Sequence, residues 1–390
     1  MEKGIGVDMA IISILIVTFL LCVVIDKVYE AEWKKNLTAD VAFSVGEVRA
    51  GEQLDIIETV ANDKYMIIPA VQVKFSLSRH LVVEAGIENV TVTDQSYKYD
   101  TFSLGVRQRI KRTIPIKKTK RGFYAISRVD VVSKGIFFRG HNVMSFPVNS
   151  QLHIYPTEFD VDFVKQASGK IYGEFASKIR VFDEPFSFRG IRDYDVNDPM
   201  NAVNWKATAR TGGLMTNLRD YQSSFKVMLL LNLEDSHPGT SEEIKEDCIS
   251  IAAGVIRELL RLGIQVGLIS NGIGTDGSES EKQNIVIGCD DICTYERYLR
   301  RLSEIELDAG QEEFTNILSK EKDSIQDDMM VVVISVNHNT EFLEMVGEIM
   351  ESHDGSIFIA PYENDDRWWE SNNCEISEVL PWSRQESVES

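Results

Sequence analysis

Residues 227–231 read Val-Met-Leu-Leu-Leu, five apolar residues in a row between Lys226 and Asn232. An uninterrupted apolar run is typical of a central parallel strand, which is buried on both faces. A helix is expected next, because Thr240 or Ser241 can cap its first turn and Gly263 can end it. Between these points apolar residues recur at helical spacing, at Ile249, Ala252, Val255, Ile256, Leu259 and Leu260.

Strands and helices continue to alternate after this pair. We expect strands at 265–270, 330–335 and 356–360, and helices at 290–305 and 341–350. The alternation predicts an α/β domain over residues 226–362, an open and mostly parallel sheet with helices on both faces. The tail that follows, residues 363–390, is acidic and polar, and we expect it to be mobile.

The preceding part of the chain, residues 36–157, has the pattern of an all-β domain. Val71, Val73, Phe75 and Leu77 alternate with polar residues, as in a strand with one buried face. Turn signals recur along the segment, and no long helical period interrupts them. This pattern predicts a β-sandwich of immunoglobulin-like type.

Residues 1–35 are expected to form a membrane anchor. The run from Met9 to Ile25 contains no charged residue, and about 20 apolar residues suffice for a helix to span a bilayer. A cleaved signal peptide is the rival interpretation, but only Lys3 precedes the run and no small-residue cleavage site follows it. More lysines follow the run than precede it, which predicts a single-pass cell-membrane protein with its body in the cytoplasm.

Composition excludes some functions. The formal net charge is −20, which argues against nucleic-acid binding because a phosphate backbone requires a basic face. The five cysteines are scattered without zinc-site spacing, and they fit reduced thiols. The sequence contains no phosphate loop, no H-E-x-x-H and no G-x-S-x-G motif, so we expect no enzymatic activity.

The segment that joins the two domains, residues 158–225, holds the most distinctive motif. Residues 188–199 read Phe-Arg-Gly-Ile-Arg-Asp-Tyr-Asp-Val-Asn-Asp-Pro, and residues 204–210 read Asn-Trp-Lys-Ala-Thr-Ala-Arg. This motif resembles the signature of the domain-of-unknown-function 58 family, in which R-x-Y, G-D-P and W-K-x-x-A-R precede a von Willebrand factor A-like domain. The matching residues are Arg192, Tyr194, Asp198, Pro199, Trp205, Lys206, Ala209 and Arg210.

Upstream landmarks extend the resemblance over most of the chain beyond residue 40. Residues 121–124, 135–137 and 154–156 resemble the family's R-G-x-Y, G-L-F and V-Y-P motifs. Asn197 departs from the usual Gly, and Asn201 and Ala202 stand where the family usually has two arginines. The resemblance implies a bacterial protein, a von Willebrand factor A-like fold for residues 226–362, and a MoxR-type AAA+ ATPase as a partner.

Two interpretations of the signature remain open. In the first, Trp205 fills the junction between the domains, and Arg192 or Arg210 pairs with Asp193 or Asp198 in a polar clamp. In the second, the same residues form a binding surface for a partner or ligand.

The von Willebrand factor A fold often binds Mg²⁺ through a D-x-S-x-S loop after its first strand, and here the corresponding loop is altered. Asn232 replaces the Asp, Glu234 replaces the first Ser, and Ser236 keeps the second. No acidic residue follows the predicted strand at 330–335 directly, because Asn337-His338-Asn339 comes there. We therefore expect a degenerate, empty metal site and no cofactor.

A basic cluster stands out in the β-rich part. Its spacing of two residues predicts the solvent face of a strand, and contact with anionic lipid beside the anchor is the alternative. The cluster comprises Arg107, Arg109, Lys111, Arg112, Lys117, Lys118, Lys120 and Arg121.

Together these features favour a non-enzymatic membrane-anchored scaffold or assembly factor that binds another protein. The alternative is a metal-dependent protein-binding or adhesion module of von Willebrand A type. A working metal site and an outward-facing body would favour that alternative.

Overall fold

The structure is a computed structural model of the 390-residue chain. It describes all residues except 1, 79–80, 84–89, 93–94, 136–141, 158, 160, 182–187, 195–202, 220–225, 236–239, 275–282, 292, 308–311, 364–366, 371–375, 377 and 385–390. The chain forms two compact units. The first contains Met1–Thr157 and Leu299–Ile305, and the second contains most of the chain from Glu158 to Ser390.

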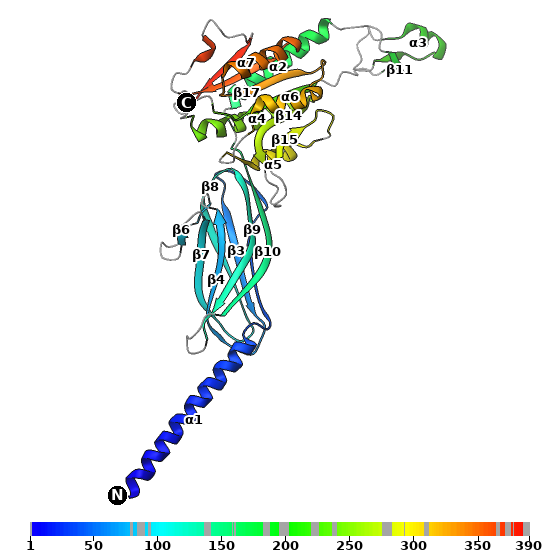
Figure 1. Cartoon of the computed structure of the whole chain (residues 1–390). Coiled ribbons are helices and arrows are strands. Elements are labelled where there is room, and N and C mark those ends of the chain that lie inside the picture. The colour runs from blue at the N-terminus through cyan, green and yellow to red at the C-terminus, as the bar shows by residue number, and fades with distance from the viewer. Residues whose placement is uncertain are drawn as a thin grey trace. The chain divides into compact units, whose positions relative to one another are not determined.

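Helix α1 (Glu2–Glu32) begins the first unit and is continuous with it (Figure 1). Its segment Ile11–Glu32 has a mean hydropathy of 2.6 and is long and apolar enough to cross a membrane. The last turns differ from the rest, because Tyr29 and Trp33 are buried in the core of the β-sandwich. The Tyr29 hydroxyl also lies 2.7 Å from Ser133 Oγ. The apolar helix is therefore packed into the folded unit rather than tethered to it by a linker.

Two sheets form the sandwich, and both contribute to one core. One has the order β1–β3–β8–β5, and the other has the order β2–β10–β9–β4–β7–β6. Their strands are β1 (Leu37–Phe43), β2 (Glu47–Arg49), β3 (Leu54–Asn62), β4 (Ile68–Ser78), β5 (Leu81–Val83), β6 (Val90–Val92), β7 (Gln95–Leu104), β8 (Gln108–Thr119), β9 (Gly122–Ser133) and β10 (Asn142–Tyr155). Val71, Val73, Phe75 and Leu77 of β4 are all buried, as their alternation predicted, and the β-sandwich is confirmed.

Arg121 fixes a second part of the first unit. Its guanidinium donates hydrogen bonds to the carbonyl oxygens of Leu302 at 2.7 Å and Ile305 at 2.9 Å. Gly122 is required here, because a Cβ at that position would lie 2.8 Å from the Tyr124 hydroxyl oxygen. That hydroxyl donates to the Lys120 carbonyl oxygen at 2.9 Å. The Arg-Gly-Phe-Tyr landmark thus has a structural role in this unit.

The second unit contains an open sheet of order β15–β14–β13–β17–β18–β19, with β16 also pairing with β14. Strands β14, β13, β17, β18 and β19 run parallel, and β15 is antiparallel. The strands are β13 (Lys226–Asn232), β14 (Gln265–Gly274), β15 (Gln283–Ile287), β16 (Ile305–Glu306), β17 (Met330–Ser335), β18 (Ile357–Tyr362) and β19 (Val379–Ser383). The helices are α2 (Val161–Val181), α4 (Glu242–Arg261), α6 (Phe314–Glu321) and α7 (Thr340–Ser352), with short 3-10 turns at Lys322–Ser324 and Trp368–Glu370. Helix α5 (Tyr295–Ser303) starts in this unit, and its residues from Leu299 on belong to the first unit.

Helices cover both faces of this sheet, as the sequence predicted. Met228 and Leu230 of β13 pack in one cluster with α6 and α7, while α4 covers the opposite face. Helix α4 begins at its predicted cap, where Ser241 Oγ accepts a hydrogen bond from Ile244 N. It ends before Gly263, whose φ of +79° is the left-handed conformation that favours glycine.

Two sequence predictions for this unit need correction. Helix α2 packs against α4, so the α/β unit begins well before residue 226. The prediction of a wholly mobile tail is wrong for Val379–Ser383, because β19 pairs in parallel with β18 and Trp382 is buried. The aromatic ring of Trp382 lies 4.7 Å from that of Phe159, and this contact holds the added strand against the rest of the unit.

A small element carries the signature motif. Strands β11 (Phe188–Asp193) and β12 (Met215–Arg219) form an antiparallel pair, and α3 (Trp205–Thr211) packs on β12. Asn204 caps α3 by accepting a hydrogen bond from Ala207 N, and Gly212 ends the helix at a φ of +76°. The W-K-x-x-A-R part of the motif thus lies on a short helix.

Candidate functional site

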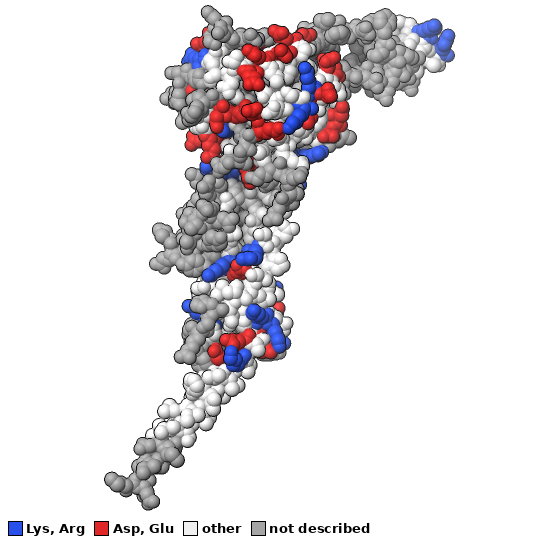
Figure 2. Space-filling view, in the orientation of Figure 1, with Lys and Arg blue, Asp and Glu red and all other residues white. Residues whose placement is uncertain are grey.

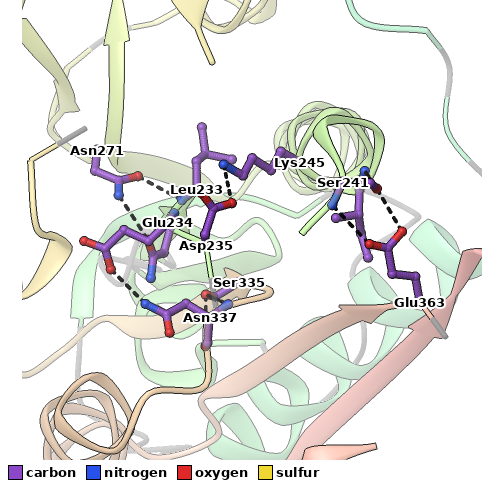
Figure 3. A network of polar contacts seen from close by, with 11 residues as sticks. Leu233, Glu234, Asp235, Ser241, Lys245, Asn271, Ser335, Asn337 and Glu363 are labelled. Atoms are coloured by element: carbon purple, nitrogen blue, oxygen red, sulfur yellow. Dashed lines mark hydrogen bonds and ion pairs between the residues drawn. The ribbon is translucent and has the colours of Figure 1, made fainter. Parts of the chain in front are cut away.

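Polar side chains converge at the carboxyl edge of the parallel sheet, after β13, β14 and β17 (Figure 3). Adjacent parallel strands end at the same edge, which brings Asn232, Asn271 and Asn337 together. The Asn232 side-chain Oδ1 accepts hydrogen bonds from Glu234 N and Asn271 Nδ2, each at 3.0 Å. Asn271 Oδ1 in turn accepts from Leu233 N at 2.9 Å. These buried amides fix the loop that leaves β13.

Glu234 joins this loop to two others. Its Oε1 accepts a 2.6 Å hydrogen bond from Phe314 N, at the start of α6. Its Oε2 accepts a 2.8 Å hydrogen bond from Asn337 Nδ2, in the loop after β17. Both carboxylate oxygens are therefore engaged by donors from the protein itself.

The next residue, Asp235, is neutralised by a lysine of α4. Asp235 Oδ1 lies 2.6 Å from Lys245 Nζ, and the lysine side chain is only 10% exposed. Nearby, Glu363 receives hydrogen bonds from Ser241 N at 3.1 Å and Ser241 Oγ at 2.8 Å. The carboxylates at this edge thus have internal partners, as Figure 3 shows.

A cavity of about 490 Å³ opens beside this network. Four carboxylates and one lysine give its wall an acidic character. The lining residues are Glu234, Asp235, Lys245, Leu307, Glu313, Thr315, Asn337, Asn339, Glu341 and Phe342.

Two of the three candidate metal ligands, Asn232 and Glu234, are already engaged in hydrogen bonds. Asn232 is fully buried, and its Oδ1 already accepts two hydrogen bonds. Glu234 is engaged on both oxygens, and Ser236 lies outside the described residues. Among the residues that the structure describes, no group of three or more His, Cys, Asp or Glu side chains is placed to hold a metal ion. The oxygen atoms of Asn232 and Glu234 fit a hydrogen-bonded loop better than the open coordination sphere of a metal ion.

The signature residues lie apart from this network in the chain. Trp205, Lys206, Ala209 and Arg210 all belong to α3 and are exposed, and the indole of Trp205 is 63% exposed. Arg192 lies in β11 and Tyr194 follows it, with Tyr194 N donating to the Leu214 carbonyl oxygen. Asp198 and Pro199 are outside the described residues.

Trp205 is not buried within its own small element. A seven-residue helix on a two-stranded sheet has little surface to cover a large ring, and Ala207 is the residue of α3 that is buried. Basic side chains gather at this helix, whereas acidic ones cover much of the visible α/β unit (Figure 2). The same short helix carries the exposed Trp205, Lys206 and Arg210.

Part of the basic cluster lies on β8. Arg109 and Lys111 are exposed, two residues apart on one face of the strand, as predicted for a solvent face. Arg121, at the far end of the cluster, serves the contacts described above.

The pKa of Asp247 in the α/β unit is shifted. Burial raises the pKa of Asp247 on α4 to about 6, although Arg384 Nη1 lies 2.7 Å from its Oδ2 and opposes the shift. Sequence inspection does not identify this pair, because 137 residues separate its members. The same is true of Lys245, Asn271 and Glu363, whose partners come from other elements.

Comparison with known proteins gives weak likenesses. No protein-family model matches the chain. No curated protein matches it. Among solved structures, the CARDB domain of a Pyrococcus furiosus protein is 17% identical over 30% of this chain and 94% of its own, with a TM-score of 0.19. A non-cellulosomal cohesin from Archaeoglobus fulgidus is 14% identical over 30% of this chain and 91% of its own, with a TM-score of 0.21. The third cohesin ScaC from Acetivibrio cellulolyticus, solved with a ScaB dockerin, is 15% identical over 30% and 99%, with a TM-score of 0.22.

Proposed function

We propose that this chain is a single-pass membrane protein that works as a scaffold or assembly factor and binds another protein without a catalytic step. The apolar α1 is the anchor in this proposal, and the excess of lysines after it favours a cytoplasmic body. The α/β unit, which we assign to the von Willebrand factor A type, is the binding module.

The exposed indole of Trp205 carries the proposal of protein binding. Trp and Arg are enriched among the side chains that contribute most to protein interfaces. Here Trp205 is 63% exposed on a helix whose two ends are capped, so the ring is presented by an ordered element. Lys206 and Arg210 are exposed on the same helix and favour a partner with an acidic surface. The resemblance to the domain-of-unknown-function 58 family names a MoxR-type AAA+ ATPase as the candidate.

The network at the sheet edge favours a metal-independent module over the metal-dependent alternative. A Mg²⁺ ion needs free oxygen ligands, and both oxygens of Glu234 already accept hydrogen bonds. The Lys245 ammonium lies 2.6 Å from Asp235 Oδ1 and neutralises this carboxylate, as a bound metal ion would otherwise do. Binding of Mg²⁺ would have to break these contacts.

The test is co-isolation of a partner with the tagged, full-length chain from crosslinked native membranes, with mass spectrometry to identify it. Trp205→Ala should abolish recovery of the partner while leaving the melting temperature of the purified chain almost unchanged. Tyr172→Ala, which truncates a 47% exposed aromatic side chain on α2, is the matched control and should recover the partner normally. Retention of the partner by Trp205→Ala, together with a lowered melting temperature, would show that Trp205 stabilises the fold and does not bind the partner.

A further inference from the structure

The end of the β-sandwich that receives α1 carries exposed apolar side chains. Tyr65 is 75% exposed, Ile67 is 57% exposed and Val106 is 44% exposed. They lie in two loops of the first unit, residues 63–67 between β3 and β4 and residues 105–107 between β7 and β8. We call these two segments the anchor-side loops.

The anchor-side loops are held in a fixed shape. Asn62 is fully buried, and its Nδ2 donates to the carbonyl oxygens of Met66 at 2.8 Å and Gly105 at 2.7 Å. Arg107 N donates to the Lys64 carbonyl oxygen at 3.1 Å, and the Arg107 guanidinium lies 4.2 Å from the centroid of the Tyr65 ring. The exposed side chains are therefore presented by a tied pair of loops.

These loops also contact the end of α1 directly. Lys64 Nζ donates to the carbonyl oxygens of Trp33 and, at 2.9 Å, of Lys35. Asp63 N donates to the Asn36 carbonyl oxygen at 2.9 Å. Because Trp33 is itself buried in the core, α1 cannot pivot freely relative to the loops.

Strand register places Ile67 near the boundary of the apolar helix. Tyr29 follows Ile25, the last residue of the apolar run, by about 6 Å along the helix axis. Its hydroxyl contacts Ser133, and the next residue, Lys134, donates from its backbone N to the Ala70 carbonyl oxygen. Ile67 precedes Ala70 on the side where α1 enters, so it lies up to about 10 Å nearer to the apolar segment. The polar layer of a bilayer is about 5–8 Å thick on each side. Ile67 therefore lies within the range of this layer.

We infer that the anchor-side loops rest in the head-group layer of the bilayer that α1 crosses, with Tyr65, Ile67 and Val106 in contact with lipid. The inference rests on the proposed role of α1 as an anchor. Tyrosine and aliphatic side chains beside charged ones suit this interfacial layer. Acidic residues offset the basic ones around them, so phosphatidylcholine alone suffices and no anionic lipid is required. The neighbouring charges are Lys34, Lys35, Lys64 and Arg107 against Glu30, Glu32 and Asp63.

The experiment places an environment-sensitive fluorophore on single cysteines of the full-length chain in phosphatidylcholine nanodiscs. Cys22, Cys293 and Cys374 are first replaced by alanine, while the buried Cys248 and Cys289 are kept. The reporter positions are Tyr65→Cys and Ile67→Cys. Gln53→Cys is the matched control, because it precedes β3 and so lies at the opposite end of that strand from Asn62. Ile16→Cys reports on α1 itself, and each labelled variant must melt at the temperature of the unlabelled chain.

Lipids carrying a spin label near the head group should quench the fluorophore at 65 and 67 several-fold more than at 53. Lipids labelled deep in the acyl chain should quench the fluorophore at 16. Quenching at 16 with equal, weak quenching at 65, 67 and 53 would overturn the inference and leave the anchor intact. Absence of quenching at 16 would instead show that the proposed anchor fails.

Discussion

Single residues at the sheet edge decide whether the α/β unit has a metal site or a closed polar network. Asn232 and Glu234 were singled out because the resemblance to von Willebrand factor A-like domains implies a metal-binding loop after this apolar strand. Their partners Asn271 and Phe314 come from other elements, and no local pattern marks them. The altered loop could be recognised in the sequence. The hydrogen-bond donors to its side chains could be identified only from the fold.

Asn271 provides a residue-scale test of this network. Asn271→Ala removes the donor to Asn232 Oδ1 and leaves the buried Leu233 N without its acceptor. Leaving a buried polar group unpaired costs about 1–3 kcal/mol, and we expect the free energy of unfolding to fall by that amount. Urea titration of the purified chain, followed by intrinsic fluorescence, measures the change. Asn316→Ala, at an exposed position, should shift the titration little, and an equally small shift for Asn271→Ala would contradict the network.

Asp247 gives a second test at the residue scale, through pH. Its folded-state pKa of about 6 lies above the value of about 3.9 for an unfolded Asp, so the folded state binds this proton more tightly. The resulting contribution to stability is fully present below about pH 4 and is lost as the pH rises through about 6. Between these limits the wild type should lose more stability than Asp247→Asn, measured by melting temperature. The exposed Asp327→Asn should follow the wild type, and parallel curves for all three proteins would contradict the assignment.

At the scale of elements, the helices and strands with strong hydrophobic patterns could be predicted from the sequence, and those with weak patterns could not. The uniformly apolar β13 and β17, the capped α4 and the alternating β4 were all indicated by the sequence. Helix α6 and the antiparallel β15 were missed because each is short. Strand β19 was missed because the acidic composition around it favoured a mobile tail. It joins the sheet through backbone pairing with β18 and the burial of Trp382, which composition does not reveal.

The junction between α1 and the sandwich was also unexpected, and it is testable. The sequence separates an anchor at 1–35 from a domain at 36–157, yet Tyr29 and Trp33 belong to the sandwich core. Trp33→Ala should lower the free energy of unfolding by about 3–5 kcal/mol, as for other buried large aromatic side chains. Denaturant titration of the full-length chain in detergent would show it. Lys74→Ala, at an exposed residue of β4, should change stability little, and equal effects of the two substitutions would contradict the packed junction.

At the scale of the whole molecule, the proposed orientation has a direct consequence. If the body is cytoplasmic, protease added to intact spheroplasts should leave the chain after Glu30 uncut and should digest it only after lysis. Digestion in intact spheroplasts would reverse the orientation and would favour an outward-facing adhesion module.

The central claim is that this membrane-anchored chain binds a protein partner without a metal ion. Co-isolation of the partner with the full-length chain, performed once in Mg²⁺ and once in excess EDTA, tests that claim most directly. Because internal donors engage Glu234 and Lys245 neutralises Asp235, we expect equal recovery of the partner in both conditions. Recovery that is lost in EDTA and restored by added Mg²⁺ would contradict the account and establish a metal-dependent module.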